Sequence, residues 1–247
     1  MSPIRPEMLD ALQHTPLFQG LKREEVSRIL EHARPTRVET DAYFFRQAEP
    51  AGRLYILLNG QIKVTQLTPD GQQVVMRMIN PLELFGCVAA LSGGEYPASA
   101  QATKDCEALC LYDRDIHKLM QIYPSMAVNA FQIMVKRTHE LQDRYRELAT
   151  ECVERRLAHA LLRLMQQSSH REGDLIVLDT PLARQDLAEM IGSTLYTVSR
   201  ILSQWESHQL IVAGREKISL AEPEQLQRIA EAQVFSADLK KAPLGEA

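Results

Sequence analysis

A short stretch near the C-terminal end, RQDLAEMIGSTLYTVSRIL from Arg184 to Leu202, gathers side chains suited to hydrogen bonding and apolar contact. Arg200 carries a planar guanidinium that can donate two parallel hydrogen bonds to a pair of acceptors. Tyr196 can donate one more, and Leu195 offers an apolar surface beside it. The sequence contains no Gly-rich phosphate loop, nucleophile elbow or paired His/Cys ligand set. These residues therefore predict recognition of another molecule, and we expect no enzyme activity.

Two short helices must position these side chains. With Arg184 as the first residue of the unit, its inward apolar positions are Leu187, Ile191, Val198 and Ile201. Ala188 lies where the helices cross, since a small side chain permits close approach, and Gly192 lies in the turn, where a positive φ is needed. Ser193 or Thr194 can cap the second helix. An ordinary helix pair needs neither the small residue nor the glycine, so the pattern predicts a DNA-binding helix-turn-helix.

The second helix of such a unit enters the major groove of DNA. Its outward residues are predicted to be Thr194, Leu195, Tyr196, Ser199, Arg200 and Ser203. We expect Arg200 to pair with guanine. The alternative for Arg200 is a surface salt bridge with Glu206 or Glu189. Arg184, Thr194 and Thr197 suit contacts with phosphates.

The segment after this unit, IVAGREKISL at residues 211–220, predicts a β-hairpin with Gly214 in its turn. Arg215 and Lys217 would lie near its tip. Cationic side chains there would contact the DNA backbone, so the sequence predicts a winged helix-turn-helix.

A long helix is predicted over residues 124–153, where Pro124 suits the first turn. Apolar or small residues recur along it at alternating spacings typical of a two-helix seam: Met134, Thr138, Leu141, Tyr145, Leu148 and Cys152. A helix of about 30 residues spans roughly 45 Å, more than a small barrel can cover. This favours a dimerisation helix over the alternative, a helix packed on its own domain by one stripe.

The N-terminal half shows short strands separated by tight turns. Strands are predicted at 42–46, 54–58, 62–67, 74–78 and 109–112, with turns at Asn59-Gly60, Pro69-Asp70-Gly71 and Gly93-Gly94. Helices are predicted at 6–14, 21–33, 154–166 and 222–232, and a polar loop at 168–174 followed by a strand at 175–178. No strand–helix–strand alternation occurs, so we predict an α+β protein with a small antiparallel barrel or sandwich.

Composition narrows the class of protein. The chain has 247 residues and a net charge of −4, which argues against non-specific coating of nucleic acid but permits a local basic face. Its four cysteines, Cys87, Cys106, Cys110 and Cys152, are too scattered for a disulfide framework and are interpreted as core thiols. Neither a membrane span nor a secretory signal is evident, so we expect a cytoplasmic protein without a membrane partner.

This order of elements, and above all the stretch RQDLAEMIGSTLYTVSRIL, resembles the cyclic-AMP receptor protein/FNR superfamily from about residue 15 to 232. The resemblance implies a β-roll sensor domain at 1–123, a dimerisation helix at 124–153 and a winged helix-turn-helix domain at 154–232. We expect residues 233–247 to be a mobile tail. It also implies a homodimer that reads a two-fold symmetric DNA operator. By analogy, RNA polymerase would be contacted at 166–174 and 68–73.

The segment LFGCVAALSGGEYPASAQA at residues 84–102 is similar to the family's phosphate-binding cassette but departs from it. The glutamate that holds the ribose in cyclic-AMP-binding members is replaced by Cys87, after Gly86. The arginine before a serine is replaced by Ala98, before Ser99. On the long helix, Leu141 stands where the family offers a polar side chain to adenine. These residues form our predicted effector pocket, and a buried phosphate without its arginine is costly, so control by cyclic AMP is not expected.

Other effectors remain open. An N-terminal iron–sulfur cluster is not expected, since no cysteine precedes Cys87. Haem is an alternative, with candidate ligands at His14, Cys87, His117, His139 and Met134. Oxidation of Cys87 or Cys152 is another, and activity without any effector is a third. The competing function is a ligand, redox or haem sensor subunit with little DNA specificity.

The recognition helix departs from the family too. Many members have Arg then Glu where this chain has Leu195 then Tyr196. Glutamate accepts a hydrogen bond from cytosine, whereas leucine packs on a thymine methyl group. We therefore expect an operator that keeps guanine opposite Arg200 and differs at the adjacent base pairs.

Overall fold

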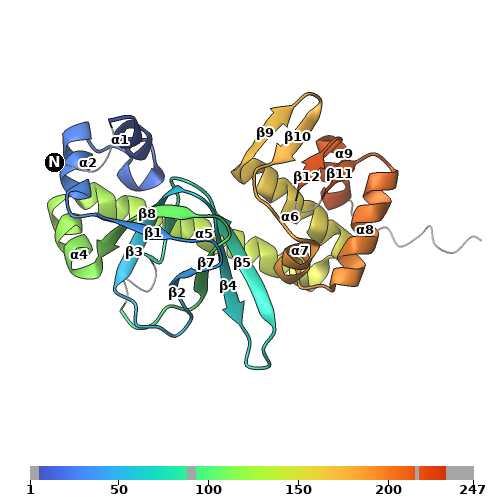
Figure 1. The fold of residues 1–247 in the computed structure, drawn as a ribbon, viewed down its shortest axis with the longest axis horizontal. Coiled ribbons are helices and arrows are strands. Elements are labelled where there is room, and N and C mark those ends of the chain that lie inside the picture. Colours follow the sequence, from blue (N-terminus) through green and yellow to red (C-terminus); the bar gives the residue numbers. More distant parts are fainter. Residues whose placement is uncertain (1–5, 88–92, 215–216, 232–247) are drawn as a thin grey trace, which may run out of the picture.

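The computed structural model describes residues 6–87, 93–214 and 217–231. A β-rich N-terminal domain, one long helix and a mixed C-terminal domain follow one another along the chain (Figure 1). This arrangement confirms the predicted α+β fold. Among the described residues, none of the helices has both the length and the apolar character needed for a membrane span.

The N-terminal domain is built on two four-stranded antiparallel sheets, ordered β1-β8-β3-β6 and β2-β7-β4-β5. Their strands are β1 (Arg34–Val38), β2 (Tyr43–Phe45), β3 (Arg53–Asn59), β4 (Ile62–Leu67), β5 (Gln73–Ile79), β6 (Leu84–Phe85), β7 (Ser99–Ala102) and β8 (Cys106–Tyr112). The predicted turn at Gly60 is present with φ 93°, and a Cβ there would lie 2.5 Å from the Asp105 carbonyl oxygen. Only glycine avoids both the strain and the clash.

Short helices close one side of this roll. They are α1 (Pro6–Gln13), the 3-10 turn η1 (Pro16–Phe18), α2 (Arg23–Leu30) and α4 (Asp113–Ile122). Leu12, Phe18, Val26 and Ile29 bury their side chains together with strand residues of the roll. The first turn of α2 is fixed by Glu25, whose carboxylate accepts from the Lys22 backbone N–H at 2.8 Å.

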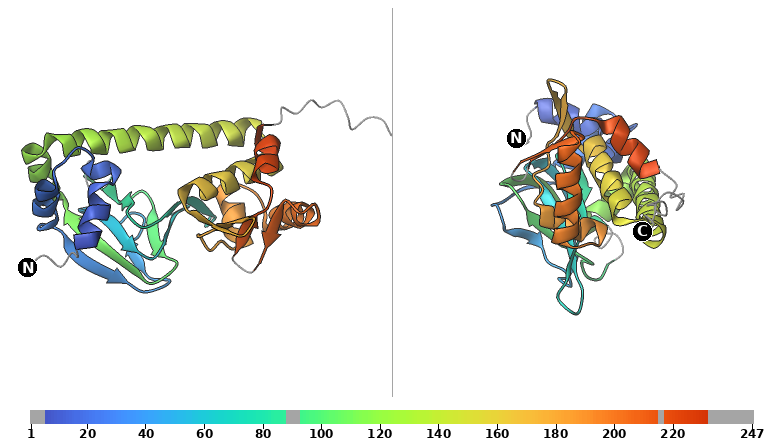
Figure 2. Two further views of the ribbon diagram at one scale, coloured as in Figure 1. Left: turned by 90° about the horizontal axis from the view of Figure 1, so that it is seen from above. Right: turned by 90° about the vertical axis from the view of Figure 1, so that its right-hand side faces the viewer.

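The long helix α5 (Pro124–Thr150) extends from the roll to the C-terminal domain (Figure 2, left). Its N-terminal half packs on the roll through Met126 and Ala130, both buried. Asn129 is buried on the same face, and its side-chain amide donates to the carbonyls of Leu17 (3.0 Å) and Gln19 (2.8 Å). These contacts fix one face of α5 against the N-terminal domain.

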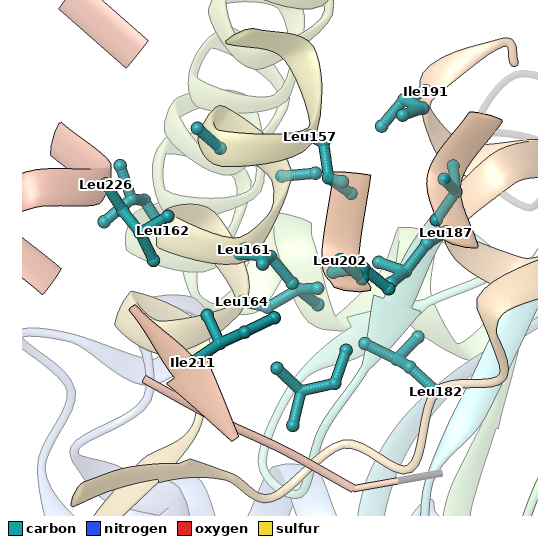
Figure 3. Packing of buried hydrophobic residues seen from close by; sticks show 14 of the residues in the cluster. Leu157, Leu161, Leu162, Leu164, Leu182, Leu187, Ile191, Leu202, Ile211 and Leu226 are labelled. Carbon is teal, nitrogen blue, oxygen red and sulfur yellow. The ribbon is translucent and has the colours of Figure 1, made fainter. Parts of the chain in front are cut away.

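The C-terminal domain contains α6 (Val153–Gln167), β9 (Ser169–Glu172), β10 (Leu175–Leu178), α7 (Arg184–Ile191), α8 (Leu195–Ser207), β11 (Ile211–Ala213), β12 (Ile218–Leu220) and α9 (Pro223–Glu231). Its sheet order is β11-β12-β10-β9. Leucine side chains from α6, α7, α8 and α9 meet over this sheet in one core (Figure 3). The polar loop predicted at 168–174 is wrong in part, since β9 pairs with β10 there. An exposed edge strand needs no apolar face, so its sequence gave no strand pattern.

The C-terminal domain also rests on the roll. Val75 and Met78 of β5 are buried in the same cluster as the core of the C-terminal domain. Lys63 on β4 pairs with Asp186 on α7 at 2.6 Å, and each side chain is only 17% exposed. The β4–β5 hairpin is therefore the surface on which the first helix of the helix-turn-helix is docked.

Candidate nucleic-acid interface and ligand cavity

The predicted helix pair is formed by α7 and α8, joined at Gly192. Gly192 adopts the left-handed conformation (φ 62°, ψ 53°), and Ala188 is 1% exposed where the two helices meet. Thr194 caps α8, since its Oγ1 accepts from the Thr197 backbone N–H at 3.2 Å. The structure therefore selects Thr194, not Ser193, as the cap. Gly192 is also close to α5, because a Cβ there would lie 3.2 Å from Leu148 Cδ2.

The inner face of α8 is fixed by the buried side chains of Val198, Ile201, Leu202 and Trp205. Trp205 also donates its indole N–H to the Glu154 carboxylate on α6 at 3.0 Å. The recognition helix is thus held from behind by apolar packing and by one hydrogen bond to a neighbouring helix.

The outer face of α8 carries the predicted reading residues. Tyr196 is 79% and Leu195 47% exposed, and the side chains of Thr194, Arg200 and Ser203 are exposed as well. Ser199, Thr197 and Arg184 are partly exposed. The outer face of α8 therefore presents hydrogen-bond donors, acceptors and apolar groups to solvent. The sequence predicted this outward orientation.

The alternative partners for Arg200 are engaged elsewhere. Glu206 accepts from the Ala213 backbone N–H at 3.2 Å, and Glu189 accepts from the side-chain amides of Gln185 and Gln73. Among the described residues, no carboxylate pairs with Arg200. Its guanidinium donors are therefore available to an external acceptor.

The predicted wing is the β11–β12 hairpin, whose turn is closed by a hydrogen bond from the Gly214 N–H to the Lys217 carbonyl at 2.7 Å. Lys217 is exposed, and its ammonium lies 3.2 Å from the Glu172 carboxylate on β9. Arg215, the other predicted wing contact, lies outside the described residues.

A cavity of about 190 Å³ lies at the predicted effector pocket in the roll. Its walls include Gly86, Cys87, Ala98, Phe45, Phe85, Tyr96, Arg77 and Arg137. Gly86 has φ 73°, and a Cβ there would meet the Arg53 carbonyl oxygen at 3.1 Å. Two predicted members do not line it. Ser99 is buried and accepts from the Gln47 backbone N–H at 2.9 Å, whereas the Leu141 side chain is 56% exposed.

Arg137 is a cavity residue that the sequence analysis missed. It comes from α5, and one of its N–H groups donates to the Cys87 Sγ at 2.9 Å while another donates to the Leu84 carbonyl. Nearby, Arg77 pairs with Glu83 at 2.7 Å, and burial together with the charge of Arg137 lowers the pKa of Arg77. Arg137 lies outside the cassette segment, but its spacing from Asn129, Ala130 and Ile133 places it on the face of α5 that packs on the roll.

Two family models match the chain, a cyclic nucleotide-binding domain at residues 35–123 and a Crp-like helix-turn-helix domain at residues 155–229. The chain is 29% identical over 219 residues to the "Cyclic AMP receptor protein" of Thermus thermophilus, covering 89% of this chain and 98% of that protein. It is 23% identical over 224 residues to a "CRP-like cAMP-activated global transcriptional regulator" of Mycobacterium tuberculosis, covering 90% of this chain and 100% of the relative.

The solved structure of FixK2 from Bradyrhizobium japonicum has the same fold, with a TM-score of 0.73 at 22% identity over 81% of this chain and 98% of that one. The chain belongs to the Crp/Fnr family of transcription regulators. In a Crp/Fnr protein, the α7–α8 unit is the DNA-binding element, and the roll is the cyclic nucleotide-binding-like domain.

The residues of the predicted dimer seam do not all lie on one exposed face of α5 in this Crp/Fnr chain. Met134 turns toward the roll, where its Sδ lies 3.9 Å from the Cys87 Sγ. Cys152 lies beyond the last residue of α5, at the cap of α6. The apolar side chains that α5 exposes begin earlier and are Val128, Phe131, Val135, Leu141, Tyr145 and Leu148. Thr138 is exposed among them, with its hydroxyl bonded to the Met134 carbonyl at 3.0 Å. A heptad pattern does not say which face of a helix its own domain covers, so the seam itself stays a prediction.

The candidate haem ligands of this Crp/Fnr chain do not converge. His14, His117 and His139 are exposed, and the His14 ring contacts the Asp10 carbonyl at 2.7 Å. Only Cys87 and Met134 lie together. Over residues 6–87, 93–214 and 217–231, no group of three His, Cys, Asp or Glu side chains could hold a metal ion.

Proposed function

We propose that this Crp/Fnr protein is a homodimeric regulator that binds a two-fold symmetric DNA operator through α8 and is not controlled by cyclic AMP. The observation that carries the DNA-binding proposal is Arg200, an exposed guanidinium with no ion-pair partner among the described residues. A bidentate contact with guanine would use donors that the protein leaves unused. Arg184, Thr194, Thr197 and the wing residues Arg215 and Lys217 would contact phosphates.

The front of α8 supports a distinctive operator. Leu195 and Tyr196 are exposed at the start of α8, at 47% and 79%. Leucine suits the methyl group of thymine, and the tyrosine hydroxyl can donate to a base or phosphate acceptor. Ser199 and Ser203 extend the same face along the helix. We therefore propose a half-site with guanine opposite Arg200 and thymine beside it.

The residues that line the cavity support the proposal that cyclic AMP does not control this protein. Cys87 and Ala98 offer no carboxylate and no guanidinium at the positions where the family binds ribose and phosphate. Dimer formation is supported by the exposed apolar stripe on α5, since apolar patches of this kind usually mark an interface. Contacts to RNA polymerase would lie on the β4–β5 tip at 68–73 and on the β9–β10 hairpin within 166–174.

Selection of bound duplexes from a random pool tests the proposal, followed by affinity measurement for wild type and Arg200→Ala. We expect a palindromic site to be enriched, and Arg200→Ala to weaken binding about 10-fold to 150-fold, as the loss of one bidentate base contact implies. Arg228→Ala, which removes an exposed arginine from α9 of the same domain, should bind as wild type.

Failure to enrich any sequence would favour the alternative of a sensor with little DNA specificity. Equal affinity of wild type and Arg200→Ala for the selected site would reject α8 as the reading element. Recovery of the usual family half-site at unchanged strength would reject only the distinctive operator.

A further inference from the structure

Another cavity of the roll, the outer cavity, has a volume of about 480 Å³, and none of the described residues that line it belongs to α5. Its walls include Glu49, Arg53, Tyr55, Tyr96, Tyr112 and Asp113. The rings of Phe45 and Tyr96 stack with centroids 3.8 Å apart and belong to the walls of both cavities. This ring pair therefore lies between the outer cavity and the cavity that Arg137 lines.

Charges of both signs border the outer cavity, and they do not pair with each other. Arg53 is exposed, and among the described residues no carboxylate lies within ion-pair distance of its guanidinium. Glu49 accepts from the Arg46 backbone N–H at 3.1 Å, and Asp113 accepts from the Arg114 backbone N–H at 2.6 Å. Each carboxylate has two oxygens, so both keep acceptor capacity after these bonds. Over the described part of the chain, the cavity thus offers a ligand one guanidinium and two carboxylates that no ion pair occupies.

The backbone sets where these charges lie relative to each other. Arg53 is opposite Tyr112 in the pairing of β3 with β8, and the Asp113 N–H donates to the Gly52 carbonyl at 3.0 Å. The Tyr96 hydroxyl donates to the Arg53 carbonyl at 2.7 Å, which holds the aromatic layer at the same place. A ligand would therefore meet a guanidinium and a carboxylate on neighbouring strand ends, in positions fixed before it binds.

The surfaces between the charges are aromatic. Phe44 meets the edge of the Tyr55 ring at 5.3 Å, and the Arg53 Cζ lies 5.4 Å from the centre of the Tyr112 ring. A hydrogen bond that its guanidinium donates to Tyr55 raises the pKa of Arg53, so this group stays charged at neutral pH. Aromatic rings attract other flat rings and ammonium ions alike. These walls suit a ligand that combines an aromatic body with charges of both signs.

We propose that the outer cavity binds an aromatic α-amino acid. Its carboxylate pairs with Arg53, and its ammonium group lies between Asp113 and Glu49. Its ring packs on Tyr55 and Tyr112. The two charges of an α-amino acid are attached to one carbon atom, as the neighbouring positions of Arg53 and Asp113 require. A guanidinium matches a carboxylate with two parallel hydrogen bonds, and the cavity volume lies within the roughly 300–1,000 Å³ usual for small-molecule sites.

Calorimetric titration of the full chain without DNA tests the proposal, with L-phenylalanine and L-tryptophan as probes. The comparison compounds each lack one recognised group. Phenethylamine has no carboxylate, 3-phenylpropionate has no ammonium group, and L-alanine has no ring. We expect saturable binding of at least one of the two probes and weaker binding of all three comparison compounds.

Two variants assign the charged groups of the ligand to their partners. Arg53→Gln should weaken the bound amino acid about 10-fold to 100-fold, because one charge-assisted pair is lost, and should leave phenethylamine binding unchanged. Asp113→Asn keeps an acceptor for the Arg114 N–H, and it should weaken the amino acid while leaving 3-phenylpropionate binding unchanged. A general loss of structure would not produce these opposite selectivities.

The matched control is Arg37→Gln, which removes an 83% exposed arginine side chain from β1 and should bind the amino acid as wild type. Thermal unfolding of each unliganded variant establishes that it is folded. No saturable binding of either probe at millimolar concentration, or equal binding by Arg53→Gln, would overturn the proposal. Loss of binding in Arg137→Gln but not in Arg53→Gln would also overturn it, because the ligand would then lie in the cavity next to α5. Since DNA is absent, none of these outcomes bears on whether α8 reads an operator.

Discussion

Tyr55 shows how the aromatic layer of the roll controls a single ionisable group. Its ring stacks on Phe85 at 5.0 Å and meets the edge of Phe44 at 5.3 Å, and the residue is 3% exposed. Burial, reinforced by the neighbouring Cys110 and Tyr96, raises the pKa of Tyr55 to about 12. The neutral phenol is therefore the form that the folded protein stabilises.

A pH dependence of stability follows from Tyr55. Its pKa is about 12 in the folded chain and near 10 when exposed, so the contribution is complete below pH 10 and is lost as pH rises toward 12. We expect the free energy of unfolding to fall by roughly 2–3 kcal/mol more across this window in wild type than in Tyr55→Phe. Denaturant unfolding at several pH values measures it. Tyr196→Phe, which changes a 79% exposed tyrosine, should follow wild type in the absence of DNA. Parallel curves for wild type and Tyr55→Phe would contradict the assignment.

At the scale of elements, α7 is held between its own domain and the roll. Lys63 and Asp186 form a partly buried pair across this contact, and the amide of Gln73 donates to Glu189 at 2.9 Å. Asp186 also accepts from the Ala183 N–H at 3.1 Å at the start of α7. The same helix thus packs against α8 and contacts the β4–β5 hairpin through these two pairs.

Lys63→Met should loosen this docking while leaving the cap of α7 intact. Removing one partner strands the Asp186 carboxylate, so we expect a loss of about 1–3 kcal/mol in unfolding free energy. Hydrogen exchange should become faster across residues 184–191. Lys217→Met breaks an exposed pair and should change stability by at most about 0.5 kcal/mol. Unchanged exchange in α7 of Lys63→Met would show that packing of Val75 and Met78 alone holds the helix.

Sequence reasoning succeeded where local geometry leaves a residue signature and failed where tertiary contacts decide. Ala188, Gly192 and Thr194 were predictable because a helix crossing, a left-handed turn and a cap each demand particular side chains. Strands β1, β6, β7 and β9 and helix α4 were not predicted, since short or polar segments carry little periodicity. Arg137 was missed for a different reason: its role depends on which face of α5 meets the roll, and spacing alone does not give that orientation.

At the scale of the whole molecule, α5 exposes its apolar stripe along the side away from the roll. Phe131 is 68% and Tyr145 74% exposed. Leu148 is a poorer reporter of the interface, because its side chain also approaches Gly192 of its own chain. The covered and exposed faces of α5 divide the helix between intrachain packing and the proposed dimer seam.

The double variant Phe131→Asp/Tyr145→Asp should be monomeric. In a dimer it would place negative charges of both chains opposite each other at two positions along α5. Sedimentation velocity at low micromolar concentration should show a dimer for wild type and a monomer for the variant, with much weaker operator binding. Gln121→Asp adds the same charge to an exposed position on α4 and should remain dimeric. A double variant that sediments as a dimer would refute the α5 interface.

The length of α5 has a mechanical consequence. Its 27 residues make a rod of about 40 Å, so a tilt of about 5° about its first turn carries its last turn by about 3.5 Å, close to the roughly 3.4 Å rise of one nucleotide along a DNA strand. Because Leu148 in this last turn lies close to Gly192, such a tilt would act on the turn between α7 and α8. In the proposed dimer, such a small tilt would change the spacing between the two reading helices by about one base step.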